Sequence, residues 1–240
     1  MTQAIILSVI VSLFASIVQT VTGFGYGIIV MAILPHLALT TTTWACLSGL
    51  VSVVTSVMIT WRYRHKVDLK KACAPLITYF PLAFFVIRAA GSIEEGNLRK
   101  ILGVSLILLS LYFIFFSKNF RIRPTLKNGM IAGSVAAVLS GLFSTGGPPI
   151  AAYLLAASDD KEEYIGNMQT YFFATAVYNS ALRIYRGYVT PQVWAVSFAA
   201  LLSSFIGVAI GHRVVDRIDG EKQKKYVYLL MLVSGVTLLF

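Results

Sequence analysis

Long apolar runs constrain this chain more than any other feature. A run of roughly 17–25 apolar residues is long enough to cross a bilayer as a helix. Hydrophobic residues make up 57% of the chain and charged residues only 12%, against about 25% charged in soluble domains. The sequence therefore predicts an all-α integral membrane protein. The apolar segments fall at about 3–35, 43–61, 72–90, 101–117, 129–157, 164–182, 192–211 and 226–240.

The basic residues lie in the short connections between these segments. The net charge of +10 would suggest nucleic acid in a soluble protein. Here it indicates membrane topology and contact with the lipid bilayer, and nucleic acid is excluded as a partner. Residues 3–19 have no basic stretch before them, and the apolar pattern continues past Gly23. We therefore expect a retained membrane segment there and not a signal peptide.

Short polar motifs recur in the same order at an offset of about 122 to 126 residues. This order predicts two homologous halves of four hydrophobic segments each, 1–120 and 121–240, joined in one integrated membrane domain. The matched pairs are 63–68 with 185–190, 93–100 with 218–225, and 22–27 with 144–149.

Loop charge suggests how the halves are oriented. A helix over 3–35 would be about 50 Å long, against a hydrocarbon core of about 30 Å. If every segment crosses once, the basic residues divide 11 to 9 between the two sides. If the first segment of each half instead returns to the side it came from, they divide 15 to 5. The positive-inside rule favours this second arrangement, with re-entrant first segments and inverted halves.

Glycine-rich breaks interrupt the first segment of each half. Non-helical backbone is tolerated at membrane depth only beside protein or a water-filled cavity. Paired glycines permit unusual backbone conformations in the second break, and its prolines suit the start of a new helix. The new helices would then point N–H groups at the centre, where they suit an anion. Close helix packing is the alternative role of these glycines.

Buried amides add to the candidate site, because amides within apolar runs face the bundle interior. Bonding between helices alone is an equal alternative for them. Arg183 ends its segment, where it could snorkel to the interface or attract anions at a vestibule. The predicted substrate-binding residues are Gln19, Thr22, Gly23, Phe24, Gly25, Tyr26, Gly27, Ser144, Thr145, Gly146, Gly147, Pro148, Pro149, Gln169 and Asn179.

The sequence lacks the motifs of several other functions. The acidic residues avoid the apolar runs, and those at 159–163 are expected to form a short connecting loop. The sequence has no phosphate-binding loop for ATP, no nucleophile–base set and no metal-ligand spacing among its three histidines. We therefore expect no enzyme activity, no catalytic or metal-binding residues and no cofactor.

The two breaks resemble the signatures of a known family. Residues 19–27 are similar to the first signature of the sulfite exporter TauE/SafE family, also called toluene sulfonate uptake permeases. Residues 144–150, with 153–155 and the acidic 159–163, are similar to the second. The resemblance covers nearly the whole chain. It implies a polytopic transporter for sulfite or organosulfonates. The family is described as a duplication of four-segment units, and the re-entrant arrangement above differs in how one segment of each unit is counted.

The leading hypothesis is a secondary transporter of a small anion, multi-pass in the cell (inner) membrane, with the anion held between the two breaks. An anion channel and a non-transporting membrane assembly subunit are the alternatives. A homodimer and a coupling ion, H⁺ or Na⁺, stay open as further partners. The sequence leaves the identity of the anion and its direction of travel undecided.

Overall fold

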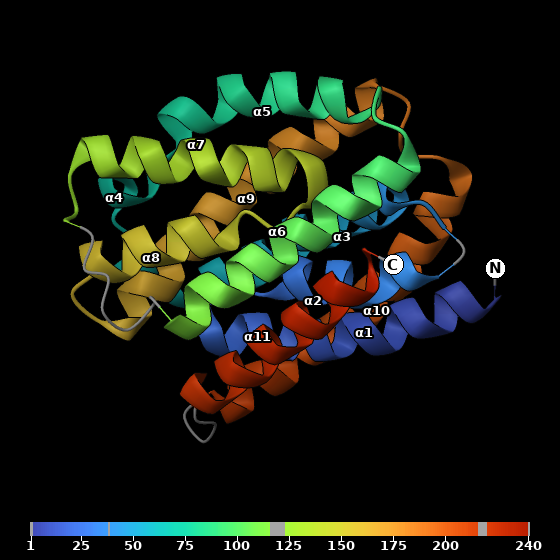
Figure 1. The fold of residues 1–240 in the computed structure, drawn as a ribbon. Helices are drawn as coiled ribbons and strands as arrows, with labels where there is room; N and C mark the ends of the chain where they lie inside the picture. The colour runs from blue at the N-terminus through green and yellow to red at the C-terminus, as the bar shows by residue number, and fades with distance from the viewer. Residues whose placement is uncertain (1, 38, 116–122, 216–219, 240) are drawn as a thin grey trace.

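The computed structural model describes residues 2–37, 39–115, 123–215 and 220–239, without the side chains of 113 and 220–227. All regular structure in these ranges is helical (Figure 1). The first half contains α1 (Thr2–Thr22), α2 (Tyr26–Ile33), η1 (Leu34–His36), α3 (Thr41–Tyr63), η2 (Arg64–Lys66), α4 (Leu69–Cys73), α5 (Leu76–Ala90) and α6 (Glu95–Phe115). The second half contains α7 (Leu126–Phe143), α8 (Gly147–Ala157), α9 (Lys161–Tyr185), α10 (Pro191–Val214) and α11 (Gly220–Thr237).

Polar side chains fix where several helices begin. At the starts of α3, α7, α9 and α10, one side chain accepts a hydrogen bond from the backbone N–H three residues later. These side chains belong to Thr40, Thr125, Asp160 and Thr190. Such N-caps satisfy a donor that has no partner within the helix. The expectation of a connecting loop over 159–163 is wrong in part, because Glu162 and Glu163 lie in the first turn of α9.

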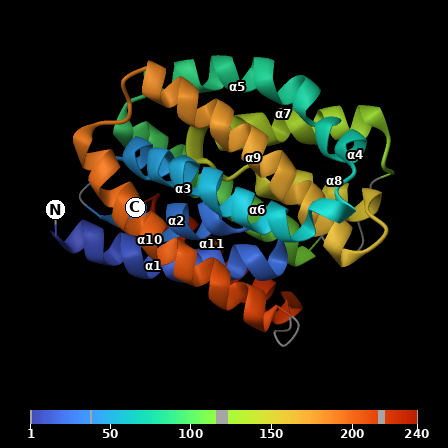
Figure 2. The same ribbon diagram turned by 180° about the vertical axis from the view of Figure 1, so that it is seen from behind.

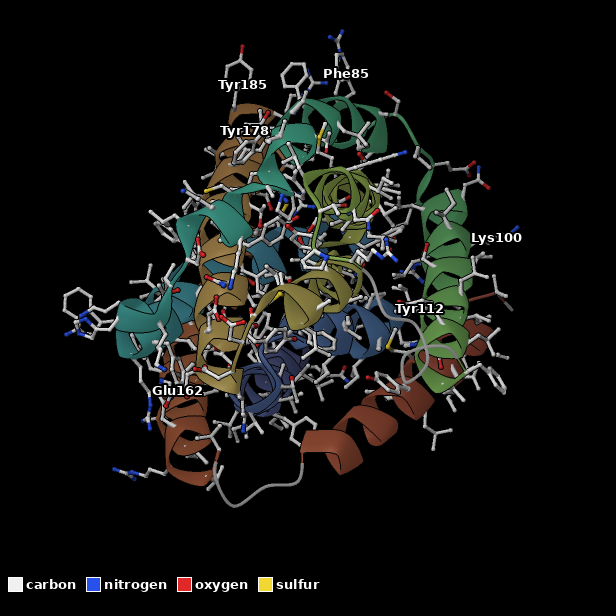
Figure 3. All side chains as sticks on the ribbon, turned by 90° about the vertical axis from the view of Figure 1, so that its left-hand side faces the viewer. Phe85, Lys100, Tyr112, Glu162, Tyr178 and Tyr185 are labelled. Atoms are coloured by element: carbon white, nitrogen blue, oxygen red, sulfur yellow. The ribbon has the colours of Figure 1, made fainter. Side chains whose placement is uncertain are left out.

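The outer surface of the bundle is apolar. Phe85 and Phe198 are 63% and 64% exposed, and Figure 3 shows Phe85 and Tyr185 projecting outward. Within the described ranges, five helical spans are long and apolar enough to cross a membrane: Thr2–Thr22, Thr41–Lys66, Leu69–Ala90, Leu126–Phe143 and Pro191–Val214. An apolar exterior of this extent is what lipid contact requires. The chain is a multi-pass membrane protein.

The helices pair in a pattern that repeats when the two halves are exchanged. The first helix of each half packs against the third segment of the other half, α1 against α10 and α7 against α5. The second and last segments pair with their counterparts, α3 with α9 and α6 with α11. Figures 1 and 2 show that α1 and α3 begin at one end of the bundle, whereas α7 and α9 begin at the other.

Helix α9 has 25 residues but is not among the five apolar spans. Its interior carries Asn167, Gln169, Asn179 and Arg183, all of them buried. Buried polar groups in a membrane protein are expensive unless they are hydrogen-bonded, and they mark functional interiors. Helix α9 therefore brings polar groups of this kind into the interior of the bundle.

Candidate functional site

The first break separates α1 from α2 at residues 23–25. Gly23 donates its N–H to Gln19 O over 2.8 Å, and its φ of +83° lies in the left-handed region. Gly25, with a φ of +116°, turns the chain into α2. A Cβ on Gly23 would also lie 2.9 Å from Cε1 of Tyr164. Both glycines are therefore required by backbone conformation.

Helix α2 opens with free backbone donors. Ile29 donates to Gly25 O over 3.0 Å, so the N–H groups of Tyr26, Gly27 and Ile28 precede the first bond of the helix. No side chain caps this end, because the N-cap residue is Gly25. These three residues all line the same cavity. The first break therefore presents uncapped N–H groups, which carry partial positive charge.

The second break, at residues 144–146, is built differently. Its left-handed residue is Ser144, with a φ of +57°, whereas Gly146 has a φ of −72°. The prediction that paired glycines provide the unusual conformation here is wrong. Glycine is required at 146 by space, because a Cβ there would lie 2.6 Å from Ala136 O. The left-handed turn that closes α7 falls on a serine whose N–H bonds to Ser140 O over 3.0 Å.

Helix α8 offers fewer donors than α2. Pro148 and Pro149 occupy its first turn, and proline has no backbone N–H. Gly147 therefore carries the only N–H among the first three residues of α8. The two helix N-termini therefore differ in the number of backbone donors that they offer.

The two breaks touch each other. A Cβ on Gly27 would overlap the carbonyl oxygen of Ser144, and a Cβ on Gly147 would lie 3.3 Å from Cβ of Phe24. Between them lies a cavity of about 40 Å³. Since about 10–15 Å³ is enough for one water molecule, the cavity has room for a group of a few heavy atoms.

The structure brings together part of the predicted set. Lining the cavity are Gln19, Gly25, Tyr26, Gly27, Ser144, Thr145, Gly147 and Asn179. Outside the lining are Thr22, Gly23, Phe24, Gly146, Pro148, Pro149 and Gln169. The lining residues that sequence reasoning missed are Ile28, Gly49, Ser52, Ser140, Phe172, Thr175 and Ala176. Small polar residues within apolar runs, such as Ser52 and Thr175, were the available signal.

An amide pair holds the first break. Gln19 Nε2 donates to Gln169 Oε1 over 3.0 Å, and Gln169 Nε2 donates to Gly23 O over 2.8 Å. Gln169 thus satisfies a carbonyl that the end of α1 leaves free. It serves as a bond between helices, whereas Gln19 both makes this bond and lines the cavity.

Asn179 has one polar atom to spare at the cavity. Its Nδ2 donates to Tyr79 Oη over 2.7 Å, and its buried Oδ1 has no protein partner. The amide oxygen and nitrogen exchange places by a simple flip that the hydrogen-bond network decides. In the orientation that the structure shows, the group left free is the acceptor Oδ1, on a residue that lines the cavity.

Arg183 is only 2% exposed, so the expectation that it snorkels to the interface is wrong. Its guanidinium donates to Ala45 O (2.8 Å), Ser144 Oγ (2.7 Å), Ser140 O (3.2 Å) and Gly141 O (3.0 Å). Arg183 therefore satisfies carbonyls at the end of α7 and holds the hydroxyl of Ser144. Its position at the end of an apolar run concealed this role in the sequence.

A helical multi-pass membrane protein with a polar cavity between interrupted helices has the architecture of a membrane transporter. The family model Sulfite exporter TauE/SafE matches residues 8–238, so the chain belongs to this family. The resemblance inferred from the two Gly-rich motifs is confirmed. The family is one of transporters and not of enzymes. A search of the curated proteins gives no match.

Proposed function

We propose that the protein is a secondary transporter of the cell (inner) membrane that carries a small anion, sulfite or an organosulfonate, in the cavity between the two breaks. One observation carries this proposal. The helix start that carries the uncapped N–H groups of Tyr26, Gly27 and Ile28 lines the cavity between the two breaks. Helix N-termini are suited to anions because they combine free donors with the positive end of the helix dipole.

The size of the cavity favours a small oxyanion group. A volume of about 40 Å³ corresponds to about three water molecules, close to the size of an SO₃ group. An organosulfonate with a bulky substituent would need the cavity to open toward one side. Sulfite and short sulfonates are therefore the best candidates for this conformation.

We further propose that the halves, 1–120 and 121–240, are inverted repeats with re-entrant first segments. The exchange symmetry of the helix pairs supports this arrangement. So does the start of α1 and α3 at the end of the bundle opposite to that of α7 and α9. By the positive-inside rule, the basic η2–α4 connection, with Arg64, Lys66 and Lys71, would face the cytoplasm.

Export would need no coupling ion. A monovalent anion that leaves a negative-inside cell gains about 2.3 kcal/mol per 100 mV. Uptake of the same anion would work against this gradient and would need H⁺ or Na⁺. We propose export. Flux measured under imposed membrane potentials of either sign would show how export depends on the potential.

The test is sulfite and methanesulfonate flux in proteoliposomes. Thr145→Val and Gly147→Leu should abolish flux while the protein still inserts, because both residues line the cavity. Gly96→Leu is the matched control, since a Cβ at Gly96 meets nothing within 4 Å. Unchanged flux in both variants would refute this site. Conductance with weak saturation would indicate a channel, and no flux with no stabilisation by anions would indicate an assembly subunit.

A further inference from the structure

Arg183 is a buried positive charge with no described counter-ion. The ion pairs among the described residues are Lys66–Asp160, Lys71–Asp159, Lys71–Glu163 and Arg99–Glu95. None of them includes Arg183. Its four acceptors are carbonyl and hydroxyl oxygens, which solvate the guanidinium without neutralising it. A buried charge in this state favours the arrival of a countercharge.

The helix ends that meet at the breaks carry only partial charges. Each break joins the C-terminus of one helix, α1 or α7, to the N-terminus of the next, α2 or α8. The negative end of one dipole therefore lies beside the positive end of another. Arg183 adds one full formal charge to these partial charges.

This charge lies directly behind the cavity wall. Ser144 lines the cavity and accepts from Arg183 Nη1, while its own hydroxyl donates to Ala45 O over 2.9 Å. Gly49 also lines the cavity, and a Cβ there would lie 3.3 Å from Arg183 Nη1. Arg183 thus acts through the wall, since both of its Nη groups already donate to wall atoms.

We propose that Arg183 makes the cavity selective for singly charged anions. This inference rests on the proposed function and narrows the substrate class of the same site. One bound negative charge neutralises Arg183, whereas a dianion leaves an uncompensated charge in an apolar interior. A sulfonate group and hydrogen sulfite, the protonated form of sulfite, each carry one charge and fit this rule. Sulfate, of similar shape with two charges, does not.

Three tetrahedral sulfur compounds of similar size test the rule: dimethyl sulfone (neutral), methanesulfonate (one charge) and sulfate (two charges). Binding to the purified full chain is measured by titration calorimetry. Methanesulfonate should bind at least about tenfold more tightly than either of the others. Equal binding of sulfate and methanesulfonate would overturn the charge rule and leave the proposed anion transporter intact. Binding of neither anion would contradict the proposed function itself.

Variants separate charge from structure. Arg183→Lys keeps the charge and should keep the preference for methanesulfonate. Arg183→Met should shift the preference to dimethyl sulfone. The control Arg186→Met also removes a positive charge near the end of α9, but from an exposed side chain, and should change nothing. A purely structural Arg183 would weaken all three compounds equally in Arg183→Met, and that result would refute the proposal.

Discussion

The two breaks occupy equivalent places in the two halves but solve the same problem with different residues. At the first, Gly23 and Gly25 adopt positive φ and the neutral amide of Gln169 donates to the buried carbonyl of Gly23. At the second, Ser144 adopts positive φ and Arg183 satisfies the carbonyls. The first break therefore supplies backbone donors, whereas the second is held by the charged side chain of Arg183 from α9. Corresponding positions in the two halves of the chain therefore need not have the same chemistry.

We expect the largest loss of stability and flux from a substitution at the contact between the two breaks. Gly27→Ala places a Cβ against the backbone oxygen of Ser144, which cannot move without displacing the second break. We expect a destabilisation of about 1–3 kcal/mol or more and loss of flux, measured by thermal unfolding and in proteoliposomes. Gly96→Ala, also in a helix but with open space around it, is the control. A Gly27→Ala protein as stable and active as this control would contradict the contact.

The second-largest effect is expected at the amide pair of Gln19 and Gln169. Gln169→Leu leaves Gly23 O unpaired in a buried place, which destabilises by about 1–3 kcal/mol. Gln192→Leu on exposed α10 surface is the matched control. A double-mutant cycle with Gln19→Leu should give a coupling energy of about 0.5–3 kcal/mol, measured by unfolding in detergent. Strict additivity of the two substitutions would disprove the bond between Gln19 and Gln169.

The two breaks should also differ, by a smaller free energy of unfolding, in how they respond to substitutions at their positive-φ residues. Gly23→Ala should destabilise by about 1–2 kcal/mol, because an L-residue with a Cβ is strained at positive φ. Ser144→Gly removes such strain and leaves Arg183 its carbonyl acceptors, so its unfolding temperature should stay near that of the wild type. The two variants compared in one thermal scan measure this difference. Equal destabilisation by both would show that the serine hydroxyl, and not φ, dominates at the second break.

The smallest effect is expected where the connections of the two halves meet, at the exposed pair of Lys66 and Asp160 (2.9 Å). The N–H of Glu163 and the ammonium of Lys66 lower the pKa of Asp160. Its contribution is therefore full at neutral pH and is lost as the pH falls through this lowered pKa. Asp160→Asn should change the unfolding temperature slightly, and less in high salt. A large effect insensitive to salt would assign this pair a different role.

Sequence reasoning located the breaks well and their chemistry poorly. Glycine at 23 and 25 signals positive φ, because few other residues adopt it. Ser144 carries no such signal, and Arg183 at the end of an apolar run reads as an interfacial residue. Gln19 and Gln169 stand out as amides in apolar runs. Their pairing across 150 positions depends on packing that periodicity does not contain.

We propose that the two breaks jointly hold one anion, and the position of a bound anion in a crystal tests this proposal. Selenite is a heavier analogue of sulfite whose selenium can be located by anomalous diffraction from crystals of the full chain. We predict one selenium site between the N-terminus of α2 and Ser144, with a selenite oxygen within hydrogen-bond reach of the Gly27 N–H. A selenium site elsewhere, with this cavity empty, would contradict the account.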